Sequence, residues 1–152
     1  MTAADAPLLR RWTIAPEDYV RIEDLLACAE VPGTVTLVAL DADGVAVAVF
    51  QAVPEGCAGD GMRTVALLVH PGRRRQGFGR ATLLAAVDEP CVAGRVLHAV
   101  IDRENSVSLR CFAACGFVAD DRAATEHYAV LVRRVRARGG VGVSRRARRT
   151  SP

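Results

Sequence analysis

The sequence predicts a mixed α/β domain, built around one central mixed sheet of about six or seven strands flanked by helices. Three observations support this class. Runs of branched and apolar residues alternate with amphipathic stretches of good helix formers. The run over residues 63–69 is apolar almost throughout, as expected of a strand covered on both faces. With 152 residues, 51% of them hydrophobic, the chain is long enough for one core and short for two.

The first half of the chain is predicted as a strand, a helix and a hairpin. Apolar residues indicate a first strand over residues 8–14. A helix is expected to begin at Pro16, because proline suits the first helical turn and acidic residues follow it. Two strands, over residues 34–40 and 45–53, flank the sequence Asp-Ala-Asp-Gly at 41–44, which indicates a hairpin turn.

Strands and helices alternate in the second half of the prediction. Gly116 is a natural end for the last helix, because glycine tolerates the backbone conformation that ends many helices. The predicted strands cover residues 63–69, 96–102 and 126–135, with a short additional strand near 117–119, and the predicted helices cover residues 77–87 and 106–115. The order of the main elements is therefore β-α-β-β-β-α-β-α-β.

Charge divides the chain into a body and a tail. There is no lysine, so all 20 basic residues are arginines. Residues 1–132 hold 12 of these arginines and all 17 acidic residues, whereas the other eight arginines follow residue 132. Residues 1–135 are expected to form the folded domain, and residues 136–152, which are rich in glycine, serine and arginine, a disordered tail.

Composition also argues against several classes of protein. No apolar run reaches the roughly 20 residues of a membrane span, and the start lacks the pattern of a signal peptide. A cytoplasmic protein without a membrane partner is therefore expected. The five cysteines show no CxxC spacing and are expected to be free thiols. His70 and His127 have no third ligand in sequence, so no metal site is predicted.

Residues 70–87, HPGRRRQGFGRATLLAAV, join a predicted strand to the helix that follows it. A helix N-terminus carries unpaired backbone N–H groups and a partial positive charge. Glycine lets the backbone approach a phosphate closely, and arginine can bind two phosphate oxygens at once. The stretch indicates a phosphate-binding loop, although these residue types alone also fit an ordinary surface turn with solvated arginines.

The spacing of the glycines narrows the choice of ligand. A P-loop needs a lysine, and a dinucleotide fingerprint needs a third glycine after Gly77 and Gly79. The pattern [QR]xxGx[GA] is met by residues 74–79, and it resembles the pyrophosphate loop of the GNAT superfamily of N-acetyltransferases, which bind acetyl-CoA. Residues 67–71 match the superfamily's preceding pattern, hydrophobic-x-Val-x-Pro.

A second stretch, NSVSLRCFAACGF over residues 105–117, carries the resemblance further. The second signature of the superfamily has an asparagine, a small residue three positions on, an aromatic residue four further on, and then Gly-Phe. The residues at these positions are Asn105, Ser108, Phe112, Gly116 and Phe117. The two motifs stand in the expected order on the expected elements, and the resemblance spans residues 8–135.

The resemblance implies how acetyl-CoA would bind. The strands over residues 63–69 and 96–102 should splay apart, so that the pantetheine arm can bind the backbone of Leu67 and Val69 as an added strand would. A backbone N–H near Leu67 or Leu68 should polarise the thioester carbonyl. Asn105 should contact the arm of acetyl-CoA. The implied binding residues are Leu67, Leu68, Val69, Arg74, Arg75, Gln76, Gly77, Phe78, Gly79, Arg80, Asn105 and Phe112.

The catalytic residues stay open at this stage. Many members of the superfamily have a tyrosine that acts as the acid where this chain has Phe112. Many also have a glutamate in one of the two splayed strands, but the matching residues here, 62–65 and 96–101, include no carboxylate, and Asp102 lies at the edge of its strand. Other groups could take or give a proton, and each also fits a packing role: His98, Ser108, Cys111 and Tyr128. Transfer without a dedicated acid is a further option, because a thiolate is a tolerable leaving group.

The activity implied by the resemblance is transfer of an acyl group from acetyl-CoA, as co-substrate, to a primary amine by direct attack. The alternative is a catalytically weak or silent module of the same fold, which binds acyl-CoA as a sensor or interaction partner. Homodimers are common in the superfamily and are an expectation here. The arginine tail is expected to be solvated rather than bound to nucleic acid, because no aromatic residues interleave with its arginines.

Overall fold

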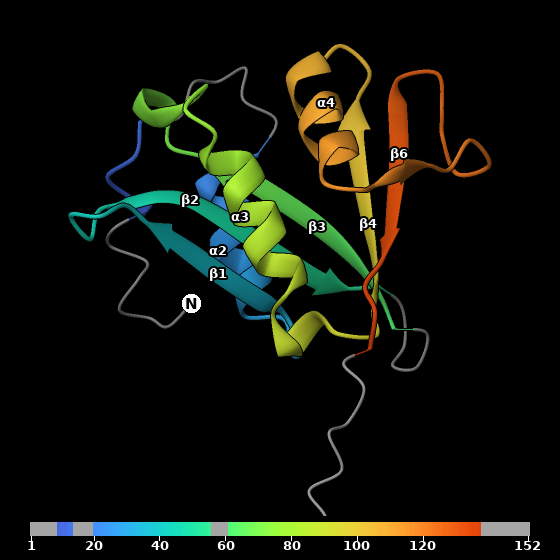
Figure 1. Cartoon of the computed structure of the whole chain (residues 1–152), viewed down its shortest axis with the longest axis horizontal. Helices are drawn as coiled ribbons and strands as arrows, with labels where there is room; N and C mark the ends of the chain where they lie inside the picture. Colours follow the sequence, from blue (N-terminus) through green and yellow to red (C-terminus); the bar gives the residue numbers. More distant parts are fainter. Residues whose placement is uncertain (1–8, 14–19, 56–60, 138–152) are drawn as a thin grey trace, which may run out of the picture.

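A six-stranded mixed sheet, in the order β1-β2-β3-β4-β6-β5, organises the residues that the computed structural model describes, namely 9–13, 20–55 and 61–137 (Figure 1). The first three strands form an antiparallel meander: β1 (Val35–Leu40), β2 (Ala46–Pro54) and β3 (Met62–Val69). The other strands are β4 (Val96–Asp102), parallel to β3, then β6 (Tyr128–Arg134) and the short β5 (Val118–Ala119), both antiparallel to their neighbours. The predicted mixed α/β class is confirmed.

Helices pack on both faces of this sheet. α3 (Phe78–Val87) and α4 (Ser106–Ala114) lie on one face, and α2 (Ile22–Ala29) lies on the other (Figure 1). Two short 3₁₀ turns, η1 (Pro71–Arg73) and η2 (Pro90–Val92), precede and follow α3. None of the helices described is long and apolar enough to cross a membrane.

Two hydrophobic cores result from the alternation of side chains along the strands. The larger core lies under α3 and α4 and includes Val65 of β3 and Leu97 of β4. The smaller core lies under α2 and includes Leu68 of β3. β3 therefore contributes apolar side chains to both faces, which explains its almost uninterrupted apolar sequence.

The predicted first strand over residues 8–14 is wrong where the structure describes it. Leu9 is helical, and the N–H of Trp12 donates to the carbonyl of Leu9 at 2.9 Å, which closes a turn. Leu9 and Trp12 are buried in the smaller core, while Arg10 and Arg11 are exposed. A burial period of three residues fits a helical turn rather than a strand.

The helix predicted from Pro16 is wrong at Val20 and Arg21, which are not helical, and α2 begins at Ile22. The other elements lie within one or two residues of their predicted bounds, and β4 matches them fully. In the hairpin between β1 and β2, Oδ1 of Asp41 accepts hydrogen bonds from the N–H groups of Asp43 and Val45, at 3.0 and 2.9 Å. The predicted helix start at Pro16 and the arginine tail from residue 138 lie outside the described residues.

Candidate functional site

β3 and β4 pair over three residues and then separate. The ladder joins Met62 to Val96, Arg63 to Leu97 and Thr64 to His98, and it ends there. Beyond this point the two strands diverge, with α3 beside β3 and α4 beside β4 (Figure 1). We term the region beyond the Thr64–His98 pair, between residues 65–69 of β3 and 99–102 of β4, the fork. The splay that the resemblance implied is therefore present.

The backbone of β3 presents hydrogen-bonding groups to the fork. The carbonyl of Met62 accepts from the N–H of Glu55 at 3.1 Å, and the N–H of His70 donates to the carbonyl of Val47 at 2.9 Å. Both bonds lie on the β2 side, and successive residues of a strand direct their backbone groups to opposite sides. The residues that direct N–H and C=O groups into the fork are Val65, Leu67 and Val69.

This alternation separates two residues that the resemblance grouped together. Leu67 directs its N–H into the fork, whereas Leu68 directs its own toward β2, where it pairs with Val49. At the wide end of the fork, which we term its mouth, the carbonyl of Val69 accepts from Nε of Arg74 at 3.4 Å. Leu67 is thus the residue of the two whose N–H is placed to polarise a carbonyl group in the fork.

The loop before α3 has a left-handed backbone at two positions. Arg75 and Gly77 both have left-handed backbones, with φ of 62° and 85°. Gly77 is the N-cap of α3 and supplies no side-chain cap. Because the first N–H groups of a helix have no partner within the helix, the first turn of α3 can donate to an anion. The N–H donors of this turn belong to Phe78, Gly79 and Arg80.

Gly79 lets α3 start close to the fork. A Cβ atom on residue 79 would lie 3.3 Å from Cγ2 of Val69, 3.5 Å from Cδ2 of Leu67 and 3.7 Å from Sγ of Cys111. One residue further along α3, the carbonyl of Arg80 accepts from Sγ of Cys115 at 3.8 Å. The start of α3 therefore packs between β3 and α4, which lies on the other side of the fork.

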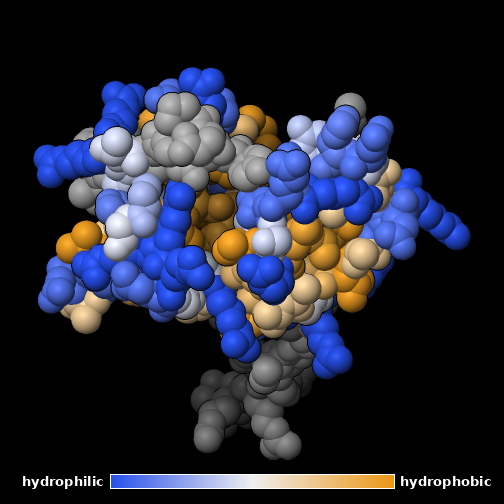
Figure 2. Space-filling view, turned by 90° about the horizontal axis from the view of Figure 1, so that it is seen from above, coloured by the Kyte–Doolittle hydropathy of each residue, from blue (hydrophilic) through white to orange (hydrophobic). Residues whose placement is uncertain are grey.

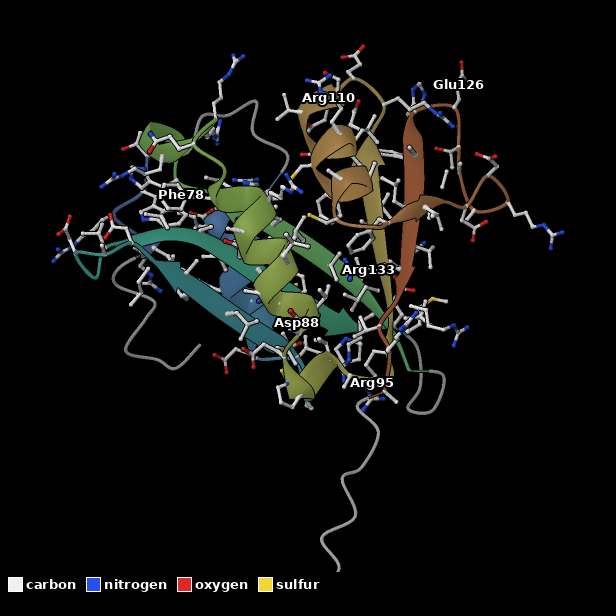
Figure 3. All side chains as sticks on the ribbon, in the orientation of Figure 1. Phe78, Asp88, Arg95, Arg110, Glu126 and Arg133 are labelled. Atoms are coloured by element: carbon white, nitrogen blue, oxygen red, sulfur yellow. The ribbon has the colours of Figure 1, made fainter. Side chains whose placement is uncertain are left out.

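Charged and apolar groups are distributed unevenly around the mouth of the fork. Seen from above, the molecule is hollowed between its two halves, with hydrophobic side chains inside the hollow and hydrophilic ones around it (Figure 2). Phe78, at the start of α3, and Arg110, on α4, lie on either side of this mouth (Figure 3). Arg73 pairs with Asp41 at 2.9 Å and ties the loop to the β1–β2 hairpin. The side chains of Arg74, Arg75 and Arg80 are exposed near α3, which makes its N-terminus electropositive.

The residues of the second motif have structural roles in α4. Oδ1 of Asn105 accepts from the N–H of Ser108 at 3.0 Å and caps the helix. Phe112 is 4% exposed, and its ring packs edge to face against Phe117, with ring centroids 4.9 Å apart. Contact of Asn105 and Phe112 with acetyl-CoA stays a prediction, since each residue is already explained by the stability of this helix.

Three of the candidate proton-transfer groups lie on α4 or at the end of β6, away from the Thr64–His98 pair. Burial, and then the neighbouring Cys115, raise the pKa of the Cys111 thiol, which makes it a poorer acid. Ser108 lies in the first turn of α4. Tyr128 is 46% exposed and opposes Asp102 at the outer end of β4.

His98, the fourth candidate, has a partner that the sequence patterns did not indicate. Its Nδ1 lies 3.0 Å from Oε1 of Glu55, and the two side chains are 16% and 33% exposed. Glu55 follows β2 directly, and the register of the sheet carries its side chain to His98. In the sequence, the only sign of this contact is that Glu55 follows a predicted strand near the expected fork. That position does not identify His98 as the partner of Glu55.

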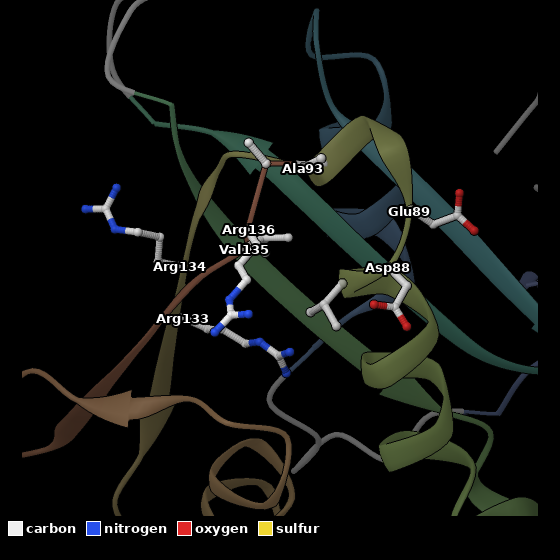
Figure 4. A pocket seen from close by; sticks show the side chains of 9 residues that line it. Asp88, Glu89, Ala93, Arg133, Arg134, Val135 and Arg136 are labelled. Carbon is white, nitrogen blue, oxygen red and sulfur yellow. The ribbon is translucent and has the colours of Figure 1, made fainter. Parts of the chain in front are cut away.

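A separate cavity of about 300 Å³ lies at the other end of α3 (Figure 4). Its charged lining consists of Asp88, Glu89, Arg133, Arg134 and Arg136. The guanidinium of Arg133 donates to the carbonyl of Cys115, which gives it a structural role. This cavity contains none of the predicted site residues. Across the described ranges, no three His, Cys, Asp or Glu side chains are grouped to hold a metal ion.

Similar proteins agree with this description of the fold. A ribosomal-protein-S18-alanine N-acetyltransferase of Escherichia coli is 18% identical, with a TM-score of 0.65 over 93% of this chain and 94% of its own. A chimera of the spermidine N-acetyltransferase SpeG of Vibrio cholerae and hSSAT is 14% identical, with a TM-score of 0.64 over 87% and 90%. YncA of Salmonella typhimurium, solved with its cofactor acetyl-CoA, is 21% identical, with a TM-score of 0.60 over 90% and 86%.

At these identities the solved structures show the fold, and the sequence itself shows the family. No curated protein matches the chain. The model of the acetyltransferase (GNAT) family matches residues 3–117, which include the loop before α3 and the second motif. The chain therefore belongs to the acetyltransferase (GNAT) family.

Proposed function

We propose that this protein is an N-acetyltransferase that uses acetyl-CoA to acylate a primary amine. The observation that carries the proposal is the fork, with the uncapped N-terminus of α3 at its mouth. A backbone edge of β3 without a β4 partner and an anion-binding turn are what an acyl-CoA needs for its pantetheine arm and its pyrophosphate. Families with the same fold can differ in activity, so the chemistry is argued from this site.

The residues around the fork fit acetyl-CoA. The turn at residues 74–80 would hold the pyrophosphate, through N–H groups and exposed arginines. Leu67 and Val69 would bind the pantetheine arm, and the N–H of Leu67 would polarise the acyl carbonyl. Acetyl-CoA supplies the activated acyl group, and the protein supplies its orientation.

The acceptor is proposed as a class rather than as a compound. The acceptors named for two of the structural neighbours are spermidine and the alanine of ribosomal protein S18. Both are amines, so we would test polyamines and peptides with a free N-terminus first. We also expect the enzyme to work in the cytoplasm, where acetyl-CoA and such acceptors would be met.

A silent acyl-CoA-binding module is the second candidate, and one observation favours it. Phe112, which stands where many relatives have a tyrosine acid, is buried against Phe117 and has no group that could donate a proton. The two candidates share the acetyl-CoA site and differ only in turnover. Release of CoA thiol in the presence of an amine separates them.

Calorimetric titration of the full chain with acetyl-CoA, and with CoA as a second ligand, tests the site. We expect micromolar binding with one site per chain. Gly77→Asp should weaken binding by roughly a hundredfold, because like charges brought together in a binding site cost several kcal/mol. Absence of binding at millimolar acetyl-CoA would overturn the proposal.

Gly94→Asp is a matched control for this variant. Gly94 also has a left-handed backbone, with φ of 76°, and a Cβ there would meet only Ala137, at 3.7 Å. It lies beyond the opposite end of α3, after η2. Both variants carry the same backbone strain and the same added charge, so only a loss specific to Gly77→Asp assigns the pyrophosphate to the loop.

A further inference from the structure

We propose that His98 is the proton acceptor of the acyl transfer and that Glu55 positions its imidazole; this inference rests on the N-acetyltransferase function proposed above. The two side chains form a hydrogen bond with 3.0 Å between Nδ1 of His98 and Oε1 of Glu55. The pair lies where the two central strands separate.

The position of His98 along β4 places it at the base of the fork. His98 and Thr64 form the last pair of the ladder. At about 3.3 Å per residue, Leu67 lies about 10 Å further along β3 than Thr64, and Val65 only about 3 Å further. An acyl group at the N–H of Leu67 would thus lie about 10 Å from the Thr64–His98 pair, a distance that the imidazole, the acceptor nitrogen and one bridging water together can span.

His98 faces the side of the sheet from which an amine can approach. Leu97 and Ala99, its neighbours in β4, are buried in the core under α3 and α4. Side chains alternate along a strand, so His98 projects from the opposite face. On that face α2 packs over β2 and β3, while Val100 and Tyr128 are 49% and 46% exposed. The acyl donor would enter by the mouth of the fork, and the amine by this open face.

The contact with Glu55 determines which ring nitrogen can accept a proton. An ionised carboxylate only accepts hydrogen bonds, so Nδ1 of His98 carries the hydrogen and donates it. In the neutral ring, Nε2 then has a free lone pair. Glu55 therefore fixes both the tautomer and the orientation of the ring, which makes it a positioning residue rather than a catalytic one.

Each atom and proton in the transfer has a place. The acceptor arrives as an ammonium ion and gives one proton to Nε2 of His98, directly or through one water. Its nitrogen then forms the C–N bond with the acyl carbon while the C–S bond breaks. The second proton leaves the nitrogen and ends on the CoA thiolate. His98 releases its own proton to solvent across the exposed face.

Other ionisable groups share that face. Asp102 lies on the same strand, and Tyr128 and Arg134 lie opposite on β6. Among the described residues, Glu55 is the group whose hydrogen bond to the His98 ring is found. An effect of pH that depends on His98 and on Glu55 together is therefore specific to the pair.

The test compares His98→Gln, Glu55→Gln and a matched control in the full chain. CoA thiol release is followed with spermidine and with a peptide that begins with alanine as acceptors. His98→Gln should lower kcat/KM by roughly a hundredfold to ten-thousandfold, the usual range for a lost general base. Acetyl-CoA affinity should change less than twofold. His127→Gln replaces an exposed histidine and should leave both quantities unchanged.

The pH profile distinguishes proton transfer from a structural effect. In the wild-type protein kcat/KM should fall toward acidic pH, because a general base that is already protonated cannot accept a proton, and this limb should vanish in His98→Gln. Glu55→Gln should shift the pH at which this limb appears, and Glu55→Asp should bring it part of the way back to its position in the wild-type profile. In His98→Ala, free imidazole should restore part of the rate. If the limb persists in both His98→Gln and Glu55→Gln, the inference is overturned.

Failure of the inference and failure of the proposed function give different results. If His98→Gln keeps kcat/KM within threefold of wild type, His98 and Glu55 do not take part in the reaction, but the proposed N-acetyltransferase function is unaffected. If wild-type protein binds acetyl-CoA and acylates neither acceptor, nor any other amine in a wider panel, the enzyme function and the inference fall together. Should His98→Gln not fold, the profile of Glu55→Gln still decides, since Glu55 is partly exposed.

Discussion

Gly79 of α3 lies directly against Val69 of β3, so that a Cβ atom on residue 79 would come 3.3 Å from Cγ2 of Val69. The same atom would meet Leu67 of β3 and Cys111 of α4. The first turn of α3 and the edge of the fork are therefore in contact at this point. Any side chain at residue 79 that displaces α3 should also disturb the fork.

Substitution of Gly79 tests this contact. Gly79→Ala should change stability little, because the helix propensity gained, up to about 1 kcal/mol, offsets a shift of a few tenths of an ångström. Gly79→Val adds branched atoms that find no space, and overpacking should cost about 1–3 kcal/mol. Acetyl-CoA affinity should fall in the valine variant. Urea unfolding and calorimetry measure the two effects.

Ala81→Val is the control for these variants, because residue 81 is exposed on the same helix. It should lower stability by only the small difference in helix propensity. If Gly79→Val were as stable as Ala81→Val, the close packing of α3 against β3 would be contradicted.

Asn105 has two separable roles, one observed and one expected. Its Oδ1 caps α4 by accepting from the N–H of Ser108. Asn105→Ala should lower the free energy of unfolding by about 1 kcal/mol, whereas Asn105→Asp keeps a capping oxygen and should be near wild type. If the carboxamide also contacts acetyl-CoA, Asn105→Asp should still lose affinity. On the same samples, thermal melting measures the loss of the helix cap, and calorimetry measures the loss of the contact with acetyl-CoA.

A control on another helix checks that the loss comes from the cap. Arg21 is the N-cap of α2 and makes no capping hydrogen bond with its side chain. Arg21→Ala should therefore leave stability within about 0.5 kcal/mol, as is usual for surface substitutions. An equal loss in Asn105→Ala and Arg21→Ala would mean that the Asn105 hydrogen bond contributes nothing specific.

The sequence predicted those parts of the site that depend on local spacing. Gly77 and Asn105 mark helix starts, and each acts within a few residues of its own position. The apolar run of β3 and the parallel strand after α3 follow from the same local patterns, so β3, α3 and β4 were placed within one residue.

Features that depend on register or on tertiary packing could not be predicted in this way. Glu55 and His98 are 43 residues apart and meet only because β2, β3 and β4 are aligned as they are. Leu9 and Trp12 stand in a run with other apolar residues, and only their burial identifies them as the pair that faces the core with a helical period. Phe112 occupies a motif position, yet its burial against Phe117 depends on how α4 sits on the sheet.

The cysteines should differ widely in reactivity. Burial raises the pKa of Cys111 and of Cys115, whereas Cys91 is exposed. The thiolate is the reactive form, so a raised pKa leaves less of it at a given pH. In native protein at pH 8, iodoacetamide should label Cys91 first, Cys111 slowly and Cys115 only on unfolding. Peptide mass spectrometry at timed intervals resolves the three sites.

The same shifts predict how stability depends on pH in alkali. Below the pKa of an unfolded thiol, about 8.5, both states of Cys111 and Cys115 are neutral and the folded state keeps their full contribution. Above it the unfolded chain ionises first, because the folded thiols have the higher pKa, so stability should fall as the pH rises. Cys111→Ala should make this fall shallower, while Cys91→Ser, at an exposed thiol, should leave it unchanged. Rapid labelling of Cys115 in the native protein, or the same alkaline slope in Cys111→Ala as in wild type, would show that these thiols are not desolvated by the packing of α4 against α3.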